Sequence, residues 1–157
     1  MDGYEFPQVS ADEAGFEALM VLREGRRNGV YLDSRGKLSV GIGHLIVPTD
    51  NLALGDVIGD DRVDTLFRVD GSAAWTSAVS EAALANITSL AFLPFLASVN
   101  FQLGVRWTAS WPHTWRMICN GDYNEAANAL DGTPWQKETP VRVQDFQEAL
   151  RALVAST

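Results

Sequence analysis

Apolar residues recur at helical spacing near the start of the chain. Those that can share one helical face are Phe16, Leu19 and Met20, and Glu24 continues the same stripe. The segment Ser10-Ala-Asp-Glu13 has the form of a capping box, in which the serine caps the helix start and the glutamate reaches back. Gly25 is typical of a helix end. The pattern predicts a helix from about Ser10 to Arg23 or Glu24.

An alternating pattern of apolar and polar residues follows this helix. Val30-Tyr31-Leu32 is typical of a short strand, and Lys37 to Ile46 alternates as its return strand or strands. Asp33-Ser-Arg-Gly36 lies between them and has turn chemistry, because Asp and Ser start turns and Gly adopts positive φ. Gly41 and Gly43 weaken a strand interior, so they indicate bulges or a close approach of the backbone to another group.

The rest of the chain has helical spacing after a loop at residues 48–59 that is rich in Asp, Asn and Gly. A long helix begins at about Asp60, and its expected inward residues are Val63, Leu66, Phe67, Ala74 and Ala78. Later helices are expected to start near Pro94, Ser110, Asp122 and Thr139-Pro140, with Asp122 as the cap of the helix that follows it. The order of elements predicts an α+β fold in a single domain, residues 1–157, with its strands confined to one small N-terminal lobe.

Composition removes several function classes. The formal charge is −8 and the pI is about 4.6, whereas a nucleic-acid-binding protein needs a basic surface. The single cysteine, Cys119, excludes an internal disulfide, and its apolar neighbours indicate a buried side chain. No apolar run approaches the ~18 residues of a membrane span. The first residues, MDGYEFPQVSADEAG, lack the apolar core of a secretory signal.

Two acids near the predicted hairpin are candidates for catalysis. Glu24 extends an apolar stripe and ends a helix, where the dipole disfavours negative charge, and both effects raise a carboxyl pKa. Asp33 lies at a strand–turn junction with polar neighbours, so we expect it to stay ionised. Two carboxyl groups in unlike environments are typical of glycosidases. The alternative interpretation is structural, with a solvated glutamate and an aspartate that bonds its own turn.

The spacing of these acids resembles the active-site segment of the T-even bacteriophage lysozyme family, glycoside hydrolase family 24. Eight residues separate Glu24 from Asp33, five separate Asp33 from Ser39, and Val-Gly-Ile-Gly-His44 follows. The family pattern has threonine where this chain has Ser39. The further segments that resemble the family are Leu66-Phe67 with Asp70, Asn100 to Gly104, and Trp135 with Thr139-Pro140-x-Arg142.

The resemblance implies a lysozyme-like fold. A small N-terminal lobe with a short antiparallel sheet, residues 10–59, would be joined by a helix from about residue 60 to a helical lobe, residues 84–157. It also implies that Glu24 is the general acid, that Asp33 orients water or stabilises the transition state, and that Ser39 holds this water. The reaction would invert the anomeric carbon, which requires room for water between the two carboxyl groups.

Further roles are implied by the same resemblance. The residues expected to contact substrate are Gln102, Gly43 and Leu45, although a helix-end cap is an equal alternative for Gln102. Arg142 would pair with Glu24, and His44 with Asp70 in a structural ion pair. No metal site is expected, because the two histidines are far apart in the sequence.

Some positions depart from the family or have a second interpretation. Glu138 replaces a glutamine that is frequent in relatives and could compete for Arg142. The segment between His44 and Asp70 is short, which would open the cleft on that side. Two interpretations apply to Arg23, Arg26 and Arg27: they could meet carboxylates of peptide stems on the substrate, but a solvated face is the expected place for them.

The resemblance implies a muramidase that cleaves the β-1,4 bond between N-acetylmuramic acid and N-acetylglucosamine in bacterial peptidoglycan. We expect a monomeric phage or prophage lysis protein without cofactors. It would be made in the bacterial cytoplasm and released to the periplasmic wall by a separate membrane-permeabilising protein. Three alternatives stay open: a module of a phage tail or secretion device, a non-catalytic lysozyme-fold module that binds peptidoglycan or a protein, and a chitinase-like hydrolase.

Overall fold

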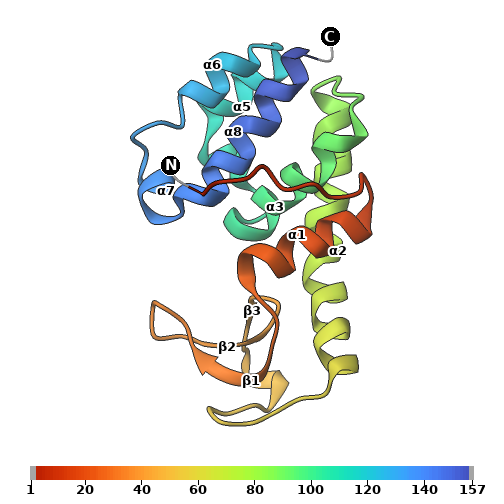
Figure 1. Cartoon of the computed structure of the whole chain (residues 1–157), viewed down its shortest axis with the longest axis vertical. Helices are drawn as coiled ribbons and strands as arrows, with labels where there is room; N and C mark the ends of the chain where they lie inside the picture. The colour runs from red at the N-terminus through yellow and green to blue at the C-terminus, as the bar shows by residue number, and fades with distance from the viewer. Residues whose placement is uncertain (1–2, 156–157) are drawn as a thin grey trace.

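The fold is α+β, and the computed structural model describes residues 3–155. The first helix, α1 (Glu13–Glu24), is followed by three strands, β1 (Arg27–Leu32), β2 (Leu38–Gly41) and β3 (His44–Leu45). The later helices are α2 (Asp60–Leu84), α3 (Leu93–Leu103), α4 (Trp107–Ser110), α5 (Pro112–Cys119), α6 (Tyr123–Asn128), α7 (Pro134–Glu138) and α8 (Pro140–Ala155). Figure 1 shows α2 running from the small sheet lobe into the helical lobe, so the predicted fold class is confirmed.

The start of α1 differs from the expected capping box. Asp12, not Ser10, is the N-cap, and its Oδ1 accepts the N–H of Gly15 at 2.9 Å. The Ser10 hydroxyl donates to the same oxygen at 2.7 Å, so it supports the cap from outside the helix. A Cβ at Gly15 would lie 1.6 Å from the Ser10 carbonyl oxygen, so the incoming chain requires glycine here. A carboxylate is the stronger acceptor, which explains why the helix begins later than predicted.

The strands of the described chain, residues 3–155, form one antiparallel sheet in the order β1-β2-β3. Ser39 lies at its centre, opposite Tyr31 on β1 and opposite Leu45 on β3. Gly41 and Gly43 have φ of 66° and 64°, so they form the turn between β2 and β3 in a conformation that other residues rarely adopt. The expected close approach at the second of these glycines places the backbone against α1.

The long helix α2 joins the two lobes and buries the predicted face. Val63, Phe67, Ala74 and Ala78 are buried, and Leu66 is partly buried. Gly71 does not interrupt the helix. A Cβ there would lie 3.2 Å from the Phe67 ring and 3.3 Å from the Phe16 ring, so glycine lets α1 pack closely on α2.

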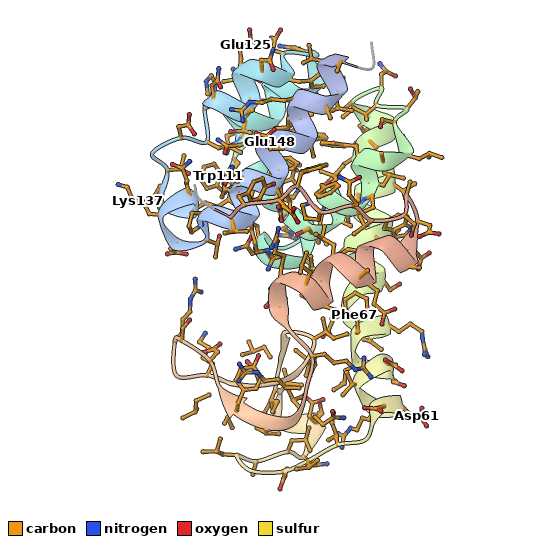
Figure 2. All side chains as sticks on the ribbon, in the orientation of Figure 1. Asp61, Phe67, Trp111, Glu125, Lys137 and Glu148 are labelled. Atoms are coloured by element: carbon orange, nitrogen blue, oxygen red, sulfur yellow. The ribbon has the colours of Figure 1, made fainter. Side chains whose placement is uncertain are left out.

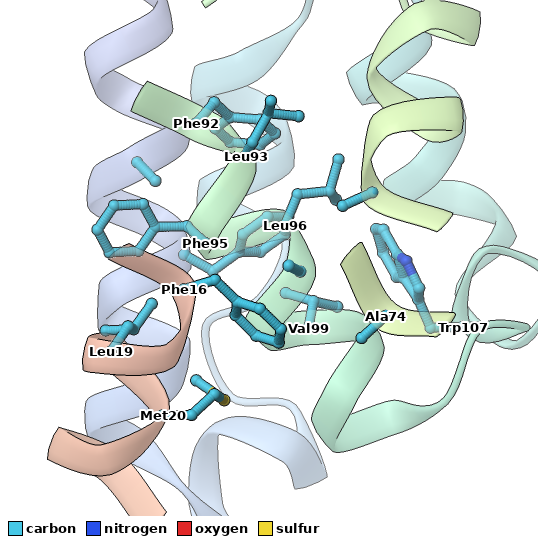
Figure 3. Packing of buried hydrophobic residues seen from close by; sticks show 14 of the residues in the cluster. Phe16, Leu19, Met20, Ala74, Phe92, Leu93, Phe95, Leu96, Val99 and Trp107 are labelled. Atoms are coloured by element: carbon cyan, nitrogen blue, oxygen red, sulfur yellow. The ribbon is translucent and has the colours of Figure 1, made fainter. Parts of the chain in front are cut away.

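The main core lies where α1, α2, α3 and α8 meet. Figure 3 shows Phe16, Leu19 and Met20 of α1 facing α3, with Trp107 on the far side. The Trp107 ring meets Phe146 of α8 edge to face at 5.9 Å, a favoured aromatic geometry. Figure 2 shows the labelled charged residues Asp61, Glu125 and Lys137 at the periphery. This core fixes the end of α1, and with it the position of Glu24.

Three details of the helical lobe differ from the sequence predictions. Cys119 is exposed at the end of α5, so its expected burial is wrong. The sequence patterns did not separate the short helices α4 and α7 from their neighbours. Asp122 precedes α6, but its side chain makes no capping hydrogen bond to it. None of the helices within residues 3–155 is both long and apolar enough to cross a membrane.

Candidate active site

A cleft of about 410 Å³ lies between the hairpin and the helical lobe. It is lined by the end of α1, the β1–β2 hairpin, the β2–β3 turn, the end of α3 and the start of α8. Residues predicted from the sequence line it together: Glu24, Asp33, Ser39, Gly43, Leu45, Gln102 and Arg142. Figure 1 shows the β1–β2 turn facing α7 across this opening. Segments that are far apart in the sequence therefore meet around one solvent-accessible space.

Glu24 is the last residue of α1, and Gly25 ends the helix with a φ of 77°. Arg142 of α8 donates from Nη1 to Glu24 Oε1. The Glu24 side chain is 28 % exposed and that of Arg142 is 9 % exposed. The carboxyl group is therefore anchored from the helical lobe through one oxygen, while the residue still faces the cleft.

Arg142 is held by more than its partner carboxylate. Its Nη2 donates to the Ser98 carbonyl at 3.2 Å and to the Ser98 hydroxyl at 3.0 Å. Burial lowers the pKa of Arg142, and the charge of Glu24 opposes that effect. A guanidinium with several fixed acceptors is a rigid support for Glu24.

Gly43 lies directly against the second carboxyl oxygen of Glu24. A Cβ at this position would approach Oε2 and Cδ of Glu24 to 2.9 Å. The φ of 64° also favours glycine. The turn between β2 and β3 therefore restricts the space around the carboxyl group that ends α1.

Asp33 is held by the turn that it begins. Its Oδ1 accepts the backbone N–H groups of Lys37 and Arg35, both at 2.8 Å. The bond from Lys37 is the largest influence that lowers the pKa of Asp33, followed by the bond from Arg35, and these outweigh the opposing effect of burial. Oδ2 makes no hydrogen bond to the residues that the structure describes, so it remains available to a water molecule.

Ser39 lies on the central strand β2, in the same cleft as Glu24 and Asp33. The residue is 5 % exposed and lines the cleft. Its hydroxyl has no hydrogen-bond partner within the described residues, so it is free to hold water. Tyr31 and Leu45 flank it on the neighbouring strands.

Gln102 enters the cleft wall near the end of α3 with its amide held by two neighbours. Its Oε1 accepts from Trp135 Nε1 at 3.0 Å, and its Nε2 donates to the Thr139 hydroxyl at 2.9 Å. One amide hydrogen remains for another acceptor. No sequence pattern predicts this contact with Trp135, because 33 residues separate the two positions.

His44 joins the hairpin to α2 through two carboxylates. Its Nδ1 lies 2.6 Å from Asp70 Oδ2, as the sequence resemblance implied. Its Nε2 lies 2.8 Å from Asp50 Oδ2, a partner that the sequence analysis missed. Burial alone would lower the pKa of His44, but the hydrogen bonds to Asp50 and Asp70 outweigh burial and raise it. With both ring nitrogens next to acceptors, His44 is suited to the charged form.

The ion pairs of Arg23 and Glu138 correct two sequence expectations. Arg23 is not on a solvated face, because its Nε and Nη2 donate to the buried carboxylate of Asp145 at 2.7 and 2.9 Å. Glu138 pairs with Arg35 at 3.1 Å, and it does not compete for Arg142. Both contacts join residues more than 100 positions apart, which the local pattern does not reveal.

Metal binding finds no support in residues 3–155, where no three His, Cys, Asp or Glu side chains are arranged to hold an ion. The cleft contains two carboxyl groups with different partners, an open hydroxyl and several cations. This arrangement can transfer protons to and from a bound molecule and can position one water.

The comparison with known families decides the assignment. The family model described as "Phage lysozyme" matches residues 22–153. The chain belongs to the phage lysozyme family. The matched range runs from the end of α1, through the sheet and α2, to near the end of α8. The phage lysozyme match therefore includes every residue that the sequence resemblance placed in the site.

One further protein is similar to this chain over most of its length. It is the "Probable T4-type lysozyme 1" of Dictyostelium discoideum, with 28% identity. The match covers 76% of this chain and 83% of the relative. The similarity therefore extends over most of both proteins.

Proposed function

We propose that this protein is a muramidase, a glycoside hydrolase that cleaves the β-1,4 bond between N-acetylmuramic acid and N-acetylglucosamine in peptidoglycan. The observation that carries the proposal is that Glu24 and Asp33 line one cleft while their carboxyl groups have different partners. Glycosidases need this division between a proton donor and an ionised carboxylate. Membership of the phage lysozyme family supports the substrate class.

In the proposed reaction Glu24 protonates the bridging oxygen as the bond from this oxygen to the anomeric carbon breaks. Arg142 occupies Oε1 of Glu24, so Oε2 is the oxygen available to carry this proton. Water attacks the anomeric carbon from the opposite face, and Asp33 accepts a proton from it through Oδ2. Exchange with solvent then returns both carboxyl groups to their starting forms. One water is consumed for each bond, and the configuration inverts.

Ser39 and Arg142 act on this reaction by positioning. The free hydroxyl of Ser39 would hold the attacking water beside Asp33, in the place of the threonine of the family pattern. Arg142 would hold Glu24 in place. Gly43, Leu45 and Gln102 would contact the sugar chain, because they line the same cleft.

A non-catalytic binding module is the weaker alternative. A module that only binds has no need of the free Oδ2 of Asp33 or of the Ser39 hydroxyl left without a partner. The cleft retains both groups together with Glu24. These features favour turnover of the bound polymer.

We propose a phage or prophage lysis protein as the biological setting, acting as a monomer because the catalytic groups all come from one chain. A membrane-permeabilising protein would give it access to the wall. Expression in a bacterium with and without such a partner tests this setting. Lysis that depends on the partner supports it, whereas incorporation into purified phage tails would support the tail module instead.

The test of activity is digestion of purified peptidoglycan and of chitin oligomers, followed by mass spectrometry of borohydride-reduced products. We expect new reduced ends on muramic acid and little cleavage of chitin. Proton NMR during the first minutes should show the α-anomer, as inversion requires. Reduced ends on N-acetylglucosamine alone, or an initial β-anomer, would contradict the proposed bond or the proposed mechanism.

A further inference from the structure

Positive charge is concentrated at the hairpin, although the chain is acidic. Residues 27–45 contain three cationic residues, Arg27, Arg35 and Lys37, and one acid, Asp33. The rest of the chain contains nine lysines and arginines against nineteen acids. A uniformly acidic surface would repel an anionic polymer, whereas this distribution attracts anionic groups to one wall of the cleft.

Not all cations around the cleft are free for a ligand. Arg142 is bound to Glu24, and Arg23 to Asp145. Lys37 lines the cleft, and its ammonium has no hydrogen bond or ion pair to any residue between 3 and 155. Arg35 also lines the cleft, and its side chain is 70% exposed. These last two cations can therefore accept an external anion.

The backbone of Arg35 and Lys37 is held directly against the proposed catalytic carboxylate of Asp33. Their backbone N–H groups both bind Oδ1 of Asp33. Their side chains therefore extend from the same turn that positions Asp33. An anionic substituent near the cleaved bond would reach them, while the neutral sugar ring occupied the cleft itself.

We propose that Arg35 and Lys37 recognise carboxylates of the stem peptide attached to muramic acid. This inference rests on the proposed muramidase function and defines its substrate as glycan that carries free-acid stem peptides. Carboxylates match the chemistry, because arginine binds them through two parallel N–H groups and lysine adds a point charge. Neutral chitin offers no such group.

Glu138 of α7 forms an ion pair with Arg35. The contact is 3.1 Å long, and both side chains are more than half exposed, at 70% and 62%. Exposed ion pairs are weak, so a substrate carboxylate can replace Glu138. The contact joins the hairpin to α7, which face each other in Figure 1, and its exchange would release this link between them.

The experiment compares two glycan substrates that differ only in charge. One carries stem peptides with free carboxylates, and in the other these carboxylates are amidated. The test variants are the double variant Arg35→Gln/Lys37→Gln and the single variant Glu138→Gln. The control is Arg116→Gln, because Arg116 is an exposed cation of α5 that does not line the cleft. KM and kcat are measured for wild type and each variant with each of the two substrates. Binding of the two substrates is measured separately with Glu24→Gln.

For the free-acid substrate we expect the double variant to raise KM roughly threefold to tenfold, with little change in kcat. Glu138→Gln should lower KM, since it frees Arg35, and Arg116→Gln should change neither constant. All differences should disappear with the amidated substrate. A purely structural role for the Arg35 contact predicts that the double variant and Glu138→Gln shift KM in the same direction, which would overturn the proposal.

Two failures can be told apart. If wild type hydrolyses neither substrate, the proposed function is wrong. The binding measurement still decides the recognition site: tighter binding of the free-acid glycan by Glu24→Gln supports it, and equal binding of both glycans overturns it. If wild type hydrolyses both substrates with equal KM, the function stands and the recognition site is wrong.

Discussion

Gly43 and Glu24 are in direct contact, although they belong to different elements. A Cβ added to Gly43 would meet Oε2 and Cδ of Glu24 at 2.9 Å. The turn between β2 and β3 therefore sets the position of the carboxyl group that ends α1. The glycine at this position serves the site as well as the turn.

Gly43→Ala should displace Glu24 and lower kcat by about tenfold to a hundredfold, the usual effect of a small misplacement of a catalytic group. Gly121→Ala is the matched control, because Gly121 has a φ of 81° and no atom within 4 Å of the added Cβ. Both variants should lose about 1–2 kcal/mol of stability from the strained φ. Equal kcat values for the two variants would show that the contact with Glu24 does not matter.

Arg142→Lys should destabilise the protein although it keeps the charge. A lysine cannot reach Glu24 and the two Ser98 oxygens together, so we expect a loss of about 1–3 kcal/mol in urea unfolding. The double variant with Glu24→Gln should lose less than the sum of the two single variants, because they share one interaction. Additive losses would mean that Arg142 stabilises the fold independently of Glu24.

His44 should make stability depend on pH. Its pKa is raised in the folded protein, so its contribution is complete below the ordinary histidine value of about 6.5 and is lost as pH rises through the folded pKa. Asp70→Asn should therefore cost about 1–2 kcal/mol near pH 6 and less near pH 9. Asp61→Asn removes a charge from an exposed position of α2 and serves as the control. A cost of Asp70→Asn that does not change with pH would rule out a charged pair.

Ser39→Ala should reduce kcat by about fivefold, because the attacking water loses a hydrogen-bond partner worth about 1 kcal/mol. Ser39→Thr restores the family residue and restricts the hydroxyl, so its kcat should equal or exceed that of wild type. Steady-state release of reducing ends measures both. Retention of full kcat by Ser39→Ala would remove this residue from the mechanism.

Local signals predicted the hairpin and its acids well. The end of α1, the Asp33 turn and the spacing to Ser39 depend on neighbours in the sequence, so the residues alone fixed their type and order. The long helix α2 was found because its inward face repeats over several turns. These elements carry the two proposed catalytic carboxyl groups.

The sequence patterns could not predict ion pairs between residues far apart in the chain. The partners of Arg23 and Arg35 lie on α8 and α7, and no periodicity relates residues across the chain. Asp50 binds His44 from a loop whose path depends on the packed sheet. The exposure of Cys119 was missed because its apolar neighbours turn inward at the end of a short helix.

The measurement that tests the central claim most directly is the rate of muramic-acid reducing-end release by wild type and by Glu24→Gln. Unfolding curves would first establish that both proteins fold. We expect the variant to lose at least about a hundredfold in kcat, the usual contribution of a positioned general acid, with KM little changed. Equal rates for the two folded proteins would contradict the assignment of Glu24 as the proton donor.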